Sequence, residues 1–134
     1  TNNMQTTQKF AKSKNVIWIT VISSAEGKQG YIQPNDAVNT FASFGSFPDH
    51  ILIDENGDLG KKFNAKTTPH IFIADKNKNI VYQGAIDNAG GTKFWTTDLN
   101  QSTNYVKKVV NDIKSNNPLS VSKTRPYGCS VKYG

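Results

Sequence analysis

The chain contains one cysteine, Cys129, and this residue type is the one in the sequence best suited to covalent chemistry. It lies in the C-terminal stretch RPYGCSVKY, with Arg125 and Lys132 close by. Positive charge favours the thiolate, which is the form that attacks disulfides. A thiol also condenses with the sulfenic acid of another cysteine to form a disulfide. Cys129 is therefore the first candidate for a functional residue; the alternative is a lone cysteine in a frayed tail, with no task.

A single cysteine excludes an internal disulfide and a zinc site built from cysteines alone. The two histidines, His50 and His70, could join Cys129 in at most a three-ligand cluster, and their spacing fits no metal motif. We therefore expect no metal and no other cofactor. His70 directly follows a proline, so it either tunes a nearby thiolate or simply begins a strand, and the second role is favoured.

The second unusual feature is the triplet Thr67-Thr68-Pro69, because a stretch typical of a strand follows it at once. Proline has no N–H to donate to a strand ladder and is normally confined to an edge or to the first residue of a strand. On composition alone, the simplest interpretation is a trans proline that opens an ordinary strand.

The elements around these residues alternate between helical and strand patterns. The β-branched run VIWITVI predicts a strand buried on both faces, and DKNKN predicts a tight hairpin. The loop at 87–101 is long enough to suggest function or mobility. Helices are expected over 3–14, about 34–44, a short stretch ending near 64, and 102–115; strands are expected over 15–24, 51–53, 70–74 and 80–86. This order predicts an α/β sandwich with a mixed sheet.

The bulk properties narrow the possible partners. The 134 residues correspond to one domain, and the net charge of +6 raises the question of nucleic acid. The lysines are scattered among acidic residues and only one arginine is present, which argues against a nucleic-acid binder. No apolar run reaches the length of about 18 residues that spans a bilayer, and the first residues lack the apolar region of a signal peptide. We expect neither nucleic acid nor membrane as partner; the compartment stays open, with the cytoplasm weakly favoured.

Several motifs occur together along the chain. The central part of the chain contains Asp54, Asn56 and Gly57, Phe63, the triplet at 67–69, and the D-x-x-x-x-I-V-Y-x-G hairpin from 75 to 84. Three more stretches are NMQ at 3–5, SSAEGKQGY at 23–31 and RPYGCSVKY at 125–133. In this combination the chain resembles the thioredoxin-like superfamily, and within it the alkyl hydroperoxide reductase and thiol-specific antioxidant (redoxin) branch.

The resemblance implies a cis peptide bond between Thr68 and Pro69. Such a bond would leave the N–H and C=O of Thr68 pointing outward, so that an extended substrate could pair with them as an added strand. It also implies that Cys129 resolves a sulfenic acid or disulfide formed at a reactive cysteine near the start of the first long helix. That cysteine is not among the 134 residues. We therefore expect an N-terminally truncated chain with one strand exposed as an edge, the alternative being a natural variant that has lost its site.

The sequence thus predicts an α/β fold, a thioredoxin-like three-layer sandwich with a mixed central sheet that is truncated at its N terminus. Residues 1–117 would form a partial redoxin domain, and 118–134 an irregular tail that carries Cys129. The expected function is that of a peroxiredoxin-like, thiol-dependent oxidoreductase and antioxidant. Its partners would be a peroxide or protein disulfide and a thiol electron donor, with Cys129 as the redox-active residue and Thr68 and Pro69 binding the substrate backbone.

Two alternatives remain open. One is a non-catalytic thioredoxin-fold module that binds a partner protein through the same edge. The other, weaker one is a periplasmic or secreted thiol-disulfide exchange protein. If the protein is a redoxin or an exchange protein, these 134 residues alone are still expected to be inactive in peroxide turnover. The reason is that one thiol cannot complete a disulfide cycle.

Overall fold

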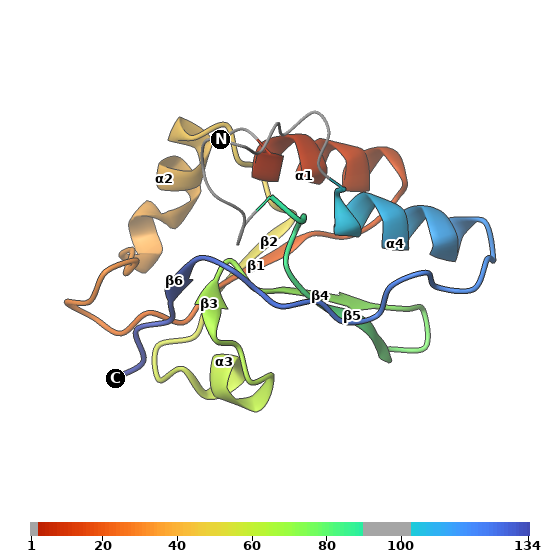
Figure 1. Ribbon diagram of the computed structural model, residues 1–134. Helices are drawn as coiled ribbons and strands as arrows, with labels where there is room; N and C mark the ends of the chain where they lie inside the picture. The colour runs from red at the N-terminus through yellow and green to blue at the C-terminus, as the bar shows by residue number, and fades with distance from the viewer. Residues whose placement is uncertain (1–2, 90–102) are drawn as a thin grey trace. The chain divides into compact units, whose positions relative to one another are not determined.

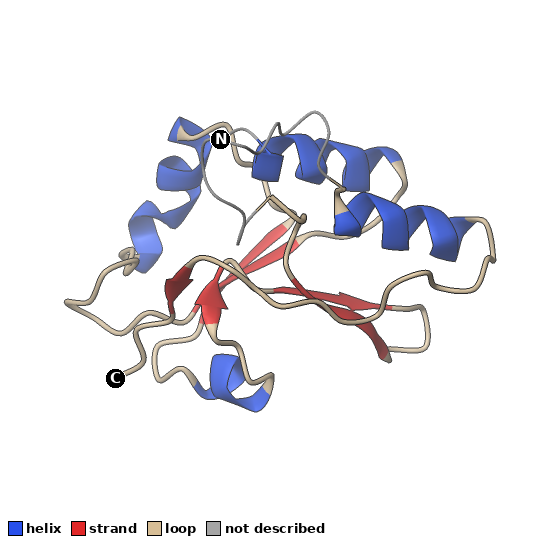
Figure 2. Cartoon of the chain, viewed as in Figure 1, coloured by secondary structure: helices blue, strands red, loops and turns tan. Residues whose placement is uncertain are grey.

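The computed structural model describes residues 3–89 and 103–134. Helices and strands are mixed along the chain (Figures 1 and 2), so the expected α/β class is confirmed. By its internal packing the chain divides into two compact units, Thr1–Ala65 with Val131–Gly134, and Lys66–Ser130. In chain order the elements are α1 (Asn3–Ser13), β1 (Ile19–Ile22), the 3-10 helix η1 (Pro34–Asp36), α2 (Ala37–Ser43), β2 (His50–Ile53), α3 (Asp58–Lys62), β3 (Thr67–Thr68), β4 (Ile71–Ala74), β5 (Ile80–Gly84), α4 (Tyr105–Lys114) and β6 (Cys129–Ser130).

In the first unit, β1 and β2 form a parallel pair, in register from Ile19 opposite His50 to Ile22 opposite Ile53. Side chains alternate along β1: Ile22 is buried, whereas Ile19 is 52% and Val21 is 39% exposed. The expectation of a strand buried on both faces is therefore wrong. β-branched residues favour the extended backbone on either face of a sheet, and packing decides which face is covered.

Helix α1 of the first unit is fixed by polar contacts as well as by its apolar face. Ala11 is buried, and Gln8, only 4% exposed, donates from Nε2 to Ser46 Oγ at 3.0 Å. One turn earlier, Gln5 Nε2 donates to the carbonyl of Phe44 at 2.8 Å. These bonds join α1 to the loop that follows α2. None of the helices in the described part of the chain has the length and apolar character needed to cross a membrane.

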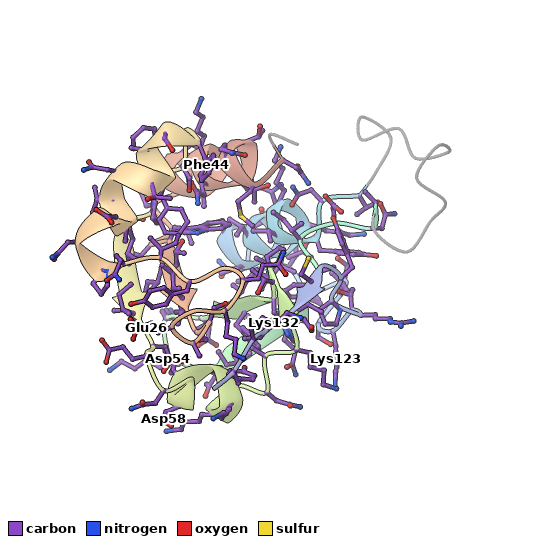
Figure 3. The ribbon with its side chains drawn as sticks, turned by 90° about the vertical axis from the view of Figure 1, so that its left-hand side faces the viewer. Glu26, Phe44, Asp54, Asp58, Lys123 and Lys132 are labelled. Carbon is purple, nitrogen blue, oxygen red and sulfur yellow. The ribbon has the colours of Figure 1, made fainter. Side chains whose placement is uncertain are left out.

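The short helix α3 depends on one carboxylate. Asp54 accepts hydrogen bonds from the Ser23 hydroxyl at 2.7 Å, the Gly60 N–H at 2.8 Å and the Leu59 N–H at 3.1 Å. Burial acts to raise the pKa of Asp54, but these hydrogen bonds to the charged form outweigh it and lower the pKa below its ordinary value of 3.8. Figure 3 shows Asp54 next to this helix, of which Asp58 is the first residue.

We predict that Asp54→Ala lowers the free energy of unfolding by about 1 kcal/mol at pH 7, because the first N–H groups of α3 lose their acceptor. The folded-state pKa is the lower one, so this stabilisation is present above about pH 4 and is lost as the pH falls further. Denaturant unfolding of both proteins between pH 7 and pH 3 should show the difference shrinking. The neighbouring, exposed Glu55 provides the control, Glu55→Ala, with a change within about 0.5 kcal/mol. A pH-independent difference would contradict the role of the charge.

In the second unit, β4 and β5 form the predicted antiparallel hairpin, from Ile71 opposite Gly84 to Ala74 opposite Ile80. Its turn is closed by the Asp75 carboxylate, which accepts from the N–H groups of Asn77 at 2.9 Å and Asn79 at 3.0 Å. Such local bonding is the reason that aspartate and asparagine favour turns. The expected hairpin is therefore confirmed.

Helix α4 belongs to the same unit and begins at a side-chain cap. Asn104 Oδ1 accepts from the N–H of Lys107 at 3.0 Å, which satisfies one donor of the first turn. Val106, Val109 and Val110 are buried at helical spacing. Tyr82 of β5 is fully buried, and its ring centroid lies 6.3 Å from that of Tyr105. The core of this unit therefore contains the apolar face of α4 and the inward residue of β5.

The segment before β6 runs beside β5, as Figure 1 shows. The N–H of Gln83 donates to the carbonyl of Ser122, and the N–H of Thr124 donates to the carbonyl of Gln83, both at 3.1 Å. The Thr124 hydroxyl lies 2.6 Å from the Tyr82 hydroxyl and accepts from the Ala85 N–H at 2.9 Å. This part of the tail thus has little regular structure, yet it is hydrogen-bonded into the second unit.

Candidate functional site

The three residues that the sequence predicts as site residues are brought together in the second unit. Strands β3 and β6 pair antiparallel, with Thr68 directly opposite Cys129 and Thr67 opposite Ser130 (Figure 1). The peptide bond between Thr68 and Pro69 is cis, as expected. Cys129 is exposed and forms no disulfide. The arrangement is an exposed thiol on a short strand whose neighbour, β3, ends immediately before Pro69.

The edge of β3 is not open, which corrects the expectation that Thr68 points outward toward an extended substrate. The chain's own strand β6 lies on that edge. The interpretation of Cys129 as part of a frayed tail is wrong for the same reason. Sequence patterns could not show this pairing, because it joins segments far apart in the chain and each strand has two residues.

Gly128 allows β6 to approach β3 closely. Its φ of +136° lies in a region that residues with a Cβ rarely adopt. A Cβ at this position would meet the carbonyl oxygen of Thr68 and lie 2.9 Å from its carbonyl carbon. A side chain at residue 128 is therefore incompatible with the observed pairing. The glycine was visible in the motif RPYGCSVKY, but the requirement for it was not.

A partly buried hydrogen bond holds the tail immediately before Gly128. The Tyr127 hydroxyl donates to Oδ1 of Asp87, a carboxylate that is 2% exposed and also accepts from the Ala89 N–H at 2.9 Å. Burial, and then the hydrogen bond and charge of Asp87, raise the pKa of Tyr127 well above its ordinary value. The phenol therefore stays protonated and continues to donate. No pattern in the sequence indicates that these two residues pair.

The last four residues belong to the first unit and are anchored there. The N–H of Ala25 donates to the carbonyl of Lys132 at 2.9 Å, and the Tyr133 hydroxyl donates to the carbonyl of Ala65 at 2.8 Å. The Tyr133 ring packs on Gly60, where an added Cβ would lie 2.9 Å from the ring, and Lys61 Nζ lies 5.4 Å from the ring centroid. Burial, and then the charge of Asp54, raise the pKa of Tyr133. Residues on both sides of β6 are thus fixed.

His70 has structural contacts. Its Nδ1 accepts from the N–H of Lys66 at 3.1 Å, and its ring stacks on Phe72 with centroids 4.5 Å apart. Burial, and then the charge of Lys66, lower its pKa, which favours the neutral imidazole that this bond requires. These contacts support a structural role for His70, which directly precedes β4.

The other candidates from the sequence contribute little here. His50 is an exposed residue of β2 in the first unit. Among the residues that the structure describes, no group of three or more His, Cys, Asp or Glu side chains is placed to hold a metal ion. Most of the predicted loop at 87–101 lies outside the described residues.

The fold and the site together define an α/β protein with an exposed cysteine on a paired edge strand. Solved structures are similar to it, and two of them each align over 98% of this chain. One is an uncharacterized conserved protein from Geobacillus kaustophilus, with a TM-score of 0.78, 18% identity and 68% of its own chain covered. The other is a hypothetical protein from Sinorhizobium meliloti 1021, with a TM-score of 0.78, 19% identity and 70% of its chain covered. Identity this low shows a shared fold alone. No family model and no curated protein matches the chain.

Proposed function

We propose that the chain is a thioredoxin-like redoxin domain of the three-layer sandwich type. In the intact protein it would act as a thiol-dependent oxidoreductase on a peroxide or a protein disulfide. The observation that carries the proposal is the register of β3 and β6, which sets the exposed Cys129 opposite Thr68. The sequence resemblance assigns redox chemistry to the first of these residues and substrate binding to the second.

The chemistry proposed for Cys129 is thiol–disulfide exchange. Its thiolate would attack one sulfur of a disulfide, a new S–S bond would form, and the second sulfur would leave as a thiolate. With a sulfenic acid as partner, the same thiolate would form a disulfide and the hydroxide would leave as water after protonation. Thr68 and Pro69 would hold the backbone of the substrate next to the thiol, which makes the attack effectively intramolecular.

We expect the protein to form one mixed disulfide per chain, located at Cys129, when it is treated with an extended peptide that carries a disulfide-linked reporter thiol. The rate should exceed that of the free peptide RPYGCSVKY by at least about tenfold, because the peptide has the same local charges but no strand edge. Release of the reporter measures the rate, and mass spectrometry locates the adduct. Equal rates for protein and peptide would contradict the proposal.

The same preparation should consume at most about one equivalent of peroxide per chain in the presence of a thiol donor. The resemblance makes Cys129 the resolving thiol and not the one that peroxide oxidises, and the chain has no second cysteine for peroxide to attack. Sustained consumption that Cys129→Ser abolishes would show that one cysteine suffices, contrary to our expectation.

The pairing of β3 with β6 shows that this edge accepts an added strand. That observation favours a second candidate, a non-catalytic module in which a partner protein takes the place of β6 on β3. For such a module, Cys129→Ser would leave partner binding unchanged, and the protein would react with the disulfide peptide no faster than the free tail peptide does.

A further inference from the structure

Strand β6 is paired with the edge of β3 to which the proposed function assigns the substrate. We infer that this edge is an exchange site, at which β6 and an external extended peptide compete for Thr68. The inference rests on the proposed function, because it takes β3 as the substrate platform. It adds a regulatory contact, because β6 must leave β3 before the substrate binds. It also adds a requirement on the substrate peptide, which must resemble the tail at the position of Gly128.

The requirement on the substrate peptide follows from Gly128. A Cβ at that position would collide with the carbonyl of Thr68, and the φ of +136° is itself unfavourable for other residues. A peptide that pairs with β3 as β6 does therefore needs glycine immediately before the residue opposite Thr68. Such a peptide is an extended segment of the form glycine followed by two residues, with its chain antiparallel to β3.

The strand can leave without the rest of the tail. Strand β6 has two residues, and Gly128, Cys129 and Ser130 are all exposed, so little apolar area holds it on β3. The firm attachments lie on either side, at Tyr127 on Asp87 and at Tyr133 on Ala65. If β6 opens while Tyr127 stays bound, Cys129 remains tethered two residues from an anchored position. Peptide binding and retention of the thiol near the site are therefore compatible.

A cross-link tests the competition directly. Residues directly opposite in an antiparallel pair have Cα atoms about 4.5–5.5 Å apart, within the range that a disulfide spans. In Thr68→Cys, oxidation by diamide should therefore join residues 68 and 129, as the two thiols give two electrons and two protons to the oxidant. Failure to form this intramolecular disulfide would contradict the register on which the inference depends.

The probe is a fluorescent peptide with the sequence of residues 125–133 and serine in place of Cys129. Reduced Thr68→Cys should bind it, and the oxidised form, in which β6 is locked on β3, should bind it at least tenfold more weakly. Because the two forms are one protein, a general loss of folding cannot produce the difference. Equal binding by the two forms would overturn the competition.

A second variant opens the edge. Gly128→Ala should bind the probe at least tenfold more tightly than the wild type, because its tail can no longer pair with β3. The matched control is Gly27→Ala: Gly27 also has a positive φ, +75°, but an added Cβ there meets nothing within 4 Å. It should bind like the wild type. Unchanged affinity in folded Gly128→Ala, judged by circular dichroism, would contradict the inference.

The outcomes separate the inference from the proposed function. If reduced Thr68→Cys and Gly128→Ala both fold and neither binds the probe, then the edge of β3 is not a peptide platform and the proposed function fails with the inference. If all forms bind alike, including the oxidised one, the competition is refuted and the mixed-disulfide experiment still decides the redox proposal.

Discussion

Gly84→Ala should lower the free energy of unfolding by about 3 kcal/mol or more, a large fraction of the roughly 5–15 kcal/mol that stabilises a domain. Gly84 ends β5, is buried and has a φ of +142°. An added Cβ would meet the hydroxyl, carbonyl and N–H of Thr124, the last at 2.8 Å. Forcing a side chain into such a backbone region costs about 1–3 kcal/mol, and overpacking against a fixed neighbour costs a similar amount.

Denaturant unfolding of Gly84→Ala and of Gly45→Ala measures this effect against a matched control. Gly45 also has a positive φ, +70°, but an added Cβ there meets nothing within 4 Å. Its replacement should cost about 1 kcal/mol, the penalty of the left-handed conformation alone. If the two variants lost the same stability, the close approach of Thr124 to Gly84 would be of no consequence, and the segment beside β5 would be less firmly held than the structure indicates.

Asp87→Ala should destabilise the second unit by about 3 kcal/mol and release the tail at β6. The substitution removes the buried acceptor of the Tyr127 hydroxyl and of the Ala89 N–H. A hydrogen bond to a charged group is worth about 1.5–3 kcal/mol, and a buried donor left without an acceptor carries its own cost. Because Tyr127 immediately precedes Gly128, amide hydrogen exchange over residues 128–130 should accelerate more than exchange in the β4–β5 hairpin.

Tyr127→Phe is the milder, matched variant. It keeps the ring and deletes the hydroxyl, so Asp87 retains the bond from Ala89. We expect a loss of about 1–2 kcal/mol and a smaller acceleration of exchange over the same residues. Unchanged exchange at 128–130 in both variants would show that the Tyr127–Asp87 bond does not control the attachment of β6.

The attachment of β6 also affects the proposed redox chemistry, because Cys129 lies on this strand. If the tail is held as the structure shows, a variant that frees β6 should alter the rate at which Cys129 forms a mixed disulfide. Gly84→Ala and Asp87→Ala act at different points of the same attachment, so they should change that rate in the same direction. Opposite changes would argue that β6 is held by something other than the contacts described.

Features that depend on residues close together in the chain could be predicted from the sequence. The β4–β5 hairpin follows from DKNKN, because Asp75 closes the turn by bonding residues two and four positions away. Helices α1 and α4 follow from apolar spacing over three or four turns. The α/β class follows from the order of these elements. Cys129, Thr68 and Pro69 were also identifiable from the sequence, as one reactive residue type and one unusual motif.

Which distant segments meet became clear only once the folded chain was described. Composition made β1 a strand but could not show that Ile19 and Val21 lie on an exposed face. It identified Thr68 and Cys129 separately but not that they lie opposite each other, and it gave no reason to pair Asp87 with Tyr127. The difference arises from the distance along the chain over which each interaction acts. Hydrogen bonds in turns and the spacing of apolar residues in helices involve residues only a few positions apart. A pairing across the chain depends on closing long loops and on packing that a single linear pattern does not encode.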